Sequence, residues 1–184
     1  MSADRHIAIV LDRSGSMAAA RAATENGLRA FLTEQRTADG TATVSLYTFD
    51  DRFEAVYEDL PLPAVPGFHL HPRGATALLD AIGHTIARTR HRLSTLAEAD
   101  RPGQVAVVIL TDGVDNASTI YDTAQIRALI TGLQAAPRPW TFVFLGAALD
   151  TFEVARGLGI DAATTLHYDT DRTETGVEEQ RYSH

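Results

Sequence analysis

Two uninterrupted apolar runs, each closely followed by an aspartate, constrain the fold of this chain most strongly. The first covers 6–11 (HIAIVL) and precedes Asp12, and the second covers 105–110 (VAVVIL) and precedes Thr111 and Asp112. Runs of this length without polar alternation are typical of parallel strands that are covered on both faces. We therefore expect a parallel sheet with these two segments at its centre.

Helical and strand patterns alternate along the rest of the chain. Leucine and isoleucine recur at steps of three, four and seven over 78–96, which predicts a long amphipathic helix. Only three residues separate the β-rich runs 44–49 and 53–57, which predicts a hairpin at a sheet edge. Further helices are expected over 17–36 and 150–158. Another helix is expected to begin with a capping box at Asp122 and Gln125 and to reach residue 133. Further strands are expected over 141–145 and 162–166. This order predicts an open α/β sheet with helices on both faces and a ligand site at the carboxyl ends of the strands.

Composition excludes several classes of function. The chain has 184 residues, of which 45% are hydrophobic and 22% charged, as in one globular domain. The absence of cysteine excludes disulfides, cysteine-bound zinc and iron–sulfur clusters. The formal net charge of −8 argues against binding to nucleic acid or to an anionic membrane. No apolar run reaches about 18 residues and no secretory signal pattern is present, so a cytoplasmic protein is expected. All Lys and Arg positions are arginine and alanine is frequent, which suggests a bacterial source.

Five oxygen-bearing residues fall at the predicted carboxyl-end loops: Asp12, Ser14, Ser16, Thr76 and Asp112. Two carboxylates at the mouths of neighbouring strands repel each other unless a cation lies between them. The hydroxyl groups add neutral oxygen ligands, and Mg²⁺ takes about six oxygens. The set therefore predicts a site for Mg²⁺ or Mn²⁺. If one carboxylate acts through water, the metal stays electrophilic and accepts a carboxylate from outside.

The pattern Asp12-x-Ser14-x-Ser16 with Thr76 and Asp112 resembles von Willebrand factor type A (vWA) domains that carry a metal-ion-dependent adhesion site (MIDAS). The stretches 72–83 (PRGATALLDAIG) and 111–113 (TDG) are similar to those of compact bacterial members. The resemblance implies a doubly wound, mostly parallel six-strand sheet in the order 3-2-1-4-5-6, with one antiparallel edge strand. It also implies that the serines and the threonine contact the metal, that the aspartates act partly through water, and that a Glu or Asp of a partner protein completes the coordination.

The resemblance covers about residues 4–166. We expect 1–168 to form the vWA-like domain and 169–184 to be a polar, frayed tail. The family usually closes with a helix, whereas 174–184 shows little apolar periodicity, so the last helix is expected to be missing or to lie in a longer parent chain. The implied function is a noncatalytic, Mg²⁺-dependent protein-binding module, set in a bacterial regulatory or stress-response assembly.

Other interpretations of the same residues remain open. The segment from Asp12 to Ser16 also suits a capped turn before a helix, and the site can be vestigial in a structural module. An Mg²⁺-dependent phosphohydrolase with Asp12 as nucleophile is the enzymatic alternative. Such enzymes commonly resemble Asp-x-Asp at this point, whereas the third position here is Ser14 and the chain has no lysine to stabilise a phosphoryl group. We therefore expect no enzymatic activity.

Charged residues near the expected metal suggest a contact surface for the partner. This partner-binding rim is predicted to comprise Arg13, Asp51, Arg73 and Asp115. Arg13 and Arg73 would favour an anionic ligand. Asp51 and Asp115, together with Asp50 and Asn116, are otherwise interpreted as turn formers, or as residues that support the metal ligands or contact the bound ligand. His69 and His71 lack an evident third metal ligand and are interpreted as loop histidines. The basic run 89–92 is expected to be solvated, and Trp140 is expected to pack against the sheet.

Overall fold

The computed structural model describes residues 4–112, 114–146 and 151–167. Within them the strands are β1 (Arg5–Asp12), β2 (Ala42–Phe49), β3 (Phe53–Pro61), β4 (Gln104–Thr111), β5 (Trp140–Gly146) and β6 (Thr165–His167). The α-helices of the same part of the chain are α1 (Arg21–Thr37), α2 (Leu78–Thr95), α3 (Thr123–Gln134) and α4 (Thr151–Gly157). None of these helices is long and apolar enough to cross a membrane.

The strands form one sheet in the order β3-β2-β1-β4-β5-β6. β1 lies at the centre and pairs in parallel with β2 and β4, while β3 pairs antiparallel with β2 at one edge. The prediction of an α/β fold with a mostly parallel sheet is confirmed. Leu11 of β1 is opposite both Thr48 and Leu110, so the polar residues that follow β1 and β4 emerge at the same edge of the sheet.

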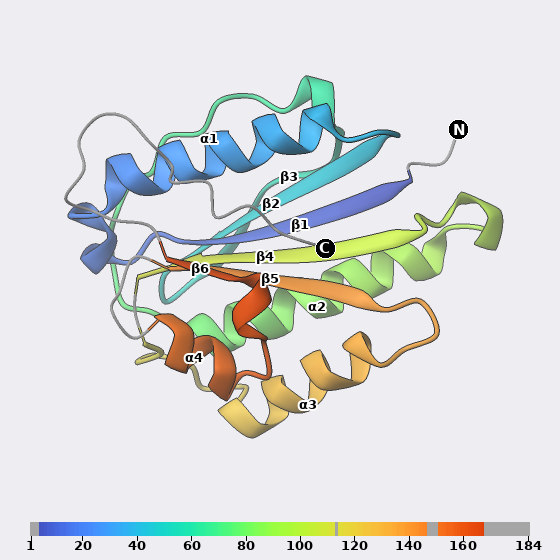
Figure 1. The fold of residues 1–184 in the computed structure, drawn as a ribbon. Coiled ribbons are helices and arrows are strands. Elements are labelled where there is room, and N and C mark those ends of the chain that lie inside the picture. Colours follow the sequence, from blue (N-terminus) through green and yellow to red (C-terminus); the bar gives the residue numbers. More distant parts are fainter. Residues whose placement is uncertain (1–3, 113, 147–150, 168–184) are drawn as a thin grey trace.

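Two hydrophobic cores lie on the two faces of the sheet. Side chains of β1 alternate between them: Ala8 and Val10 join the core under α2 and α3, whereas Ile9 and Leu11 join the core under α1. Figure 1 shows α1 on one face and α2, α3 and α4 on the other. The central strands are therefore covered on both sides, which explains why their sequences are continuously apolar.

Several element boundaries differ from the sequence predictions: β3 extends to Pro61, beyond the predicted 53–57 run, and two predicted elements begin with a 3-10 turn. The predicted 17–36 helix begins instead with a 3-10 turn, Gly15–Ala18, and the α-helix starts at Arg21, because the turn that carries the serines occupies the first positions. The predicted 162–166 strand is a 3-10 turn, Ala162–Thr164, followed by β6. The capping box at Asp122 and Gln125 is confirmed. Asp150 and the predicted 169–184 tail lie outside the described residues.

Candidate functional site

Three loops meet at the carboxyl edge of the sheet: 13–16 after β1, 73–77 before α2, and residues 112 and 114–118 after β4. Backbone hydrogen bonds join the first two, since Gly15 N donates to Gly74 O (3.0 Å) and Arg73 N donates to Arg13 O (2.7 Å). Gly74 has a φ of +74°, and a Cβ there would lie 2.6 Å from Oδ1 of Asp51. Only glycine adopts this conformation without strain, so the residue is needed for the two loops to meet.

A row of side-chain oxygens crosses from the first loop to the third. The Oγ atoms of Ser14 and Ser16 lie 3.1 Å apart, and Ser16 Oγ donates to Oδ1 of Asp112 at 3.0 Å. Adjacent ligands in an octahedron with metal–oxygen distances of about 2.1 Å are themselves about 3.0 Å apart. The three oxygens therefore have the spacing and the hard-donor chemistry that an Mg²⁺ or Mn²⁺ ion requires.

Asp12 lies beneath this row and is fully buried. Ser14 N donates to its Oδ1 (2.7 Å), and Thr111 Oγ1 donates to its Oδ2 (2.7 Å). Burial raises the pKa of Asp12, the hydrogen bonds from Ser14 and Thr111 oppose that rise, and the charge of Asp112 adds to it. A divalent cation bound nearby would favour the charged form of this carboxylate, so the electrostatics of Asp12 also suit a metal site.

The third loop positions Thr76. Thr76 N donates to Asn116 Oδ1 (2.8 Å), and Asn116 N donates back to Thr76 O (2.9 Å). The same loop is fixed to α2 by Asp80, which is largely buried and accepts three backbone N–H groups, those of residues 119–121. Thr76 is only 4% exposed and is thus held at the junction of the three loops.

Asp50, which the sequence suggested as a turn former or as support for the metal ligands, joins the loops through its side chain. Its side chain is 1% exposed; Oδ2 accepts from Arg13 Nε (3.1 Å) and Arg73 Nε (2.8 Å), and Oδ1 accepts from Arg52 N (2.7 Å). Burial alone would raise the pKa of Asp50, but the N–H of Arg52 and the arginine side chains outweigh it and lower the pKa. Its carbonyl also accepts from Ala77 N (2.9 Å), which ties the loop before α2 to β2.

The residues of the expected partner-binding rim also make contacts within the protein. Arg13 is only 11% exposed and donates to Asp50 and to Glu54 (2.8 Å), so its guanidinium also holds the loops together. Asp115 accepts from Leu79 N (3.1 Å) and from the Ser118 hydroxyl, so its carboxylate caps the start of α2. Of the predicted rim, the structure leaves Asp51 and Arg73 on the surface.

No group of three or more His, Asp or Glu side chains that could hold a metal occurs within the described residues. A cation at this site would therefore depend on the serine and threonine hydroxyls as well as on carboxylates. His69 and His71 line a hollow beside β3 together with Phe68, Glu54, Arg13 and Arg73. Within the described residues they belong to no group of three side chains that could hold a metal.

Comparison with known proteins identifies the fold. The sequence matches no protein-family model and no curated protein. Among solved structures, a von Willebrand factor type A protein from Catenulispora acidiphila aligns with a TM-score of 0.55 and 18% identity, over 90% of this chain and 38% of that one. Proximal thread matrix protein 1 from the mussel byssus, with a zinc-occupied MIDAS motif, aligns with a TM-score of 0.58 and 18% identity, over 94% and 43% of the two chains. Manganese-loaded TRAP protein from Plasmodium vivax aligns with a TM-score of 0.60 and 13% identity, over 91% of this chain and 69% of that one.

The described residues therefore have the vWA fold that the sequence motif suggested. At sequence identities of 13–18%, the similarity shows the fold alone. The chain spans about two fifths of the matched Catenulispora and mussel chains.

Proposed function

We propose that this chain is a noncatalytic module that binds a divalent cation and, through it, an acidic side chain of a partner protein. The observation that carries the proposal is the row of oxygens from Ser14 through Ser16 to Asp112, spaced at 3.1 and 3.0 Å above the buried carboxylate of Asp12. The zinc-occupied MIDAS of the mussel protein and the manganese-loaded TRAP protein support a divalent metal in this fold.

In this proposal Ser14, Ser16 and Thr76 hold Mg²⁺ or Mn²⁺ through their hydroxyls, and Asp12 and Asp112 act directly or through water. Hydroxyl ligands carry no charge, so only the two carboxylates offset the charge of the cation. When bound, the metal supplies an electrophilic coordination position that suits a Glu or Asp side chain. The hydrogen bonds from Ser14 N and Thr111 Oγ1 keep Asp12 oriented in that arrangement.

The charge of the chain supports a protein partner. The net charge of −8 disfavours nucleic acid and anionic membranes, whereas the exposed Arg73 beside the site can bond the second oxygen of a bound carboxylate. The serine at position 14 and the absence of lysine argue against a phosphohydrolase. We place the module in the cytoplasm of a bacterium, in a regulatory or stress-response assembly, a setting that its cysteine-free, arginine- and alanine-rich composition supports.

A partner pull-down from the source organism, run with Mg²⁺ and with EDTA, tests the proposal. Wild type should retain partners only with Mg²⁺, Thr76→Ala should lose them, and Arg73→Ala should weaken their retention. Thr33→Ala, an exposed hydroxyl on α1, is the matched control and should behave as wild type. Equal retention in EDTA would refute metal-dependent recognition. Turnover of a phosphoester that is lost in Asp12→Asn would show that the chain is a hydrolase instead.

A further inference from the structure

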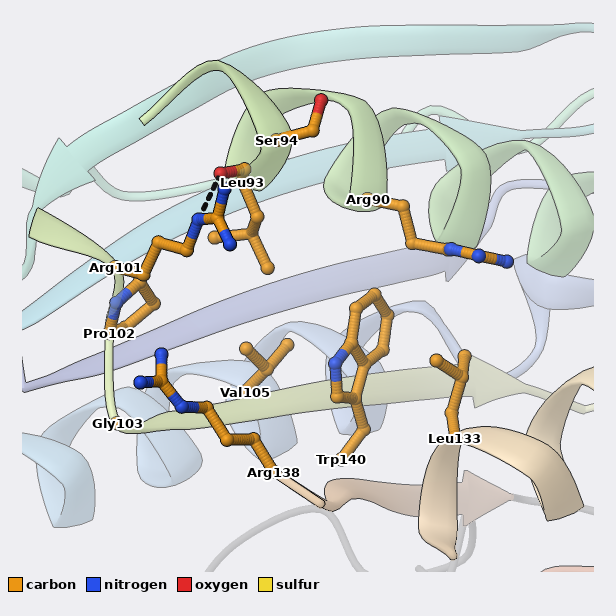
Figure 2. Close-up of a pocket in the computed structure, with 10 residues that line it drawn as sticks. All are labelled: Arg90, Leu93, Ser94, Arg101, Pro102, Gly103, Val105, Leu133, Arg138 and Trp140. Carbon is orange, nitrogen blue, oxygen red and sulfur yellow. Dashed lines mark hydrogen bonds between the residues drawn. The ribbon is translucent and has the colours of Figure 1, made fainter. Parts of the chain in front are cut away.

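A second hollow lies at the opposite end of the sheet from the candidate metal site. It is formed where β4 and β5 begin and where α2 ends, and its volume is about 290 Å³. Leu93, Val105, Leu133 and Trp140 supply its apolar lining (Figure 2). Trp140 is 9% exposed and stacks on Phe142, so it presents a fixed edge of the core to the hollow.

Three arginines, Arg90, Arg101 and Arg138, surround this apolar lining. Figure 2 shows Arg101 and Arg138 on the Gly103 side and Arg90 extending over the Trp140 side. Arg101 uses its Nε to cap α2, donating to the carbonyls of Leu93 (3.0 Å) and Leu96 (3.3 Å), and its terminal nitrogens remain beside the hollow.

Acidic partners for these arginines are scarce among the described residues. Within the described part of the chain, only Arg138 of the three has a carboxylate at ion-pair distance, that of Glu98 at 3.7 Å. Both side chains are mostly exposed, so the pair is weak. By contrast, Arg88 and Arg92 on another side of α2 pair with Glu58 of β3. The basic run 89–92 was expected to be solvated. In the structure Arg92 pairs with Glu58, whereas Arg90 lines this hollow.

We propose that the hollow binds a small organic anion in which a carboxylate or phosphate is joined to a flat apolar body. Guanidinium groups suit carboxylates and phosphates because their planar donors bond two oxygens at once. The apolar body would lie against Trp140 and Leu133, because removing these apolar surfaces from water is favourable. The volume suits a ring-sized ligand rather than a large cofactor. The chain's overall negative charge repels anions, so a local excess of arginine is needed to hold one.

Trp140 makes the test direct, because it is the only tryptophan of the chain and its indole N–H signal in a ¹H–¹⁵N spectrum needs no assignment. Phenyl phosphate and benzoate are the two anionic probes, and whichever binds more tightly identifies the anionic group. Saturable movement of the indole signal with at least one of them, weakened by added salt, supports the proposal. Equal movement with neutral benzyl alcohol, equally tight binding of inorganic phosphate, or no movement at all would overturn it.

Variants show whether the arginines are responsible. Arg101 is left intact because it caps α2. The double variant Arg90→Gln/Arg138→Gln should bind the better probe about tenfold more weakly. Arg29→Gln/Arg36→Gln on α1 removes the same charge from the other face of the sheet and should bind as wild type. If both double variants bound the probe equally weakly, the loss would follow from the change in net charge alone, and the proposed site would be refuted. Because this hollow is remote from the metal loops, either result leaves the proposed metal-dependent function untouched.

Discussion

Replacing Asp50 with alanine should destabilise the protein strongly, although Asp50 is not a proposed metal ligand. The substitution removes an acceptor of three hydrogen bonds, from Arg13 Nε, Arg73 Nε and Arg52 N. It leaves the Arg13 guanidinium, which is 11% exposed, without one of its two carboxylate partners. The loops before α2 and after β1 are both tied to this residue or its neighbours, so their positions should loosen as well.

The size of the effect follows from burial. Removing one partner of a buried ion pair costs about 3–5 kcal/mol, and the lower end applies because Arg13 keeps Glu54. Arg73 is 54% exposed, so its lost ion pair adds no more than about 1 kcal/mol. A loss of about 3 kcal/mol corresponds to a fall in Tm of roughly 6–12 °C for a chain of this size.

Thermal unfolding of Asp50→Ala and of the exposed neighbour Asp51→Ala, both without added metal, measures this directly. Asp51→Ala should change the free energy of unfolding by less than about 0.5 kcal/mol. Because the folded state lowers the pKa of Asp50, its stabilisation is present above the ordinary aspartate pKa of about 3.9 and is lost as the pH falls below it. The gap between wild type and Asp50→Ala should therefore narrow in acid. Equal melting of the two alanine variants at neutral pH would refute the role assigned to Asp50.

Three further predictions concern the stability of the fold and the loop that is fixed to α2. A Cβ at Gly83 would lie 2.3 Å from the Tyr121 ring, so Gly83→Ala should lower stability in urea by about 1–3 kcal/mol, whereas Gly132→Ala, with no atom within 4 Å, should not lower it. Burial lowers the pKa of His6, so wild type should lose stability in urea as the pH falls below about 6.5, and His6→Gln should lose less over the same range. Asp80→Asn replaces one of two accepting oxygens with a donor, so both the Tm and the affinity for Mn²⁺ should fall; an unchanged Mn²⁺ affinity would separate this loop from the metal site.

Local patterns were sufficient to predict the elements that carry the candidate ligands. The apolar runs before Asp12 and Asp112 are buried strands, and parallel pairing brings their ends to one edge, so the two aspartates could be placed together from the sequence. The turn at Ser14 and Ser16 follows directly from the end of the first run. These inferences use only neighbours in the chain and the period of the side chains.

Contacts between distant residues could not be predicted in the same way. Asp50 was expected to form a turn or to support the metal ligands, but nothing near it in sequence identifies its side-chain partners: Arg13 and Arg73 lie 37 and 23 positions away. Asn116 supports Thr76 across 40 positions for the same reason. The ion pairs of Arg13 with Asp50 and Glu54 likewise join residues that are far apart in the sequence.

Titration of metal-stripped protein with Mn²⁺, followed by the relaxation of water protons, tests the central claim most directly. Wild type should bind Mn²⁺ saturably at a single site and release it to Mg²⁺. Ser14→Ala/Ser16→Ala removes two of the proposed ligands without removing charge and should abolish that binding, while the exposed Thr33→Ala control should retain it. Saturable Mn²⁺ binding by the double serine variant with the affinity of wild type, or no binding by wild type, would contradict the account.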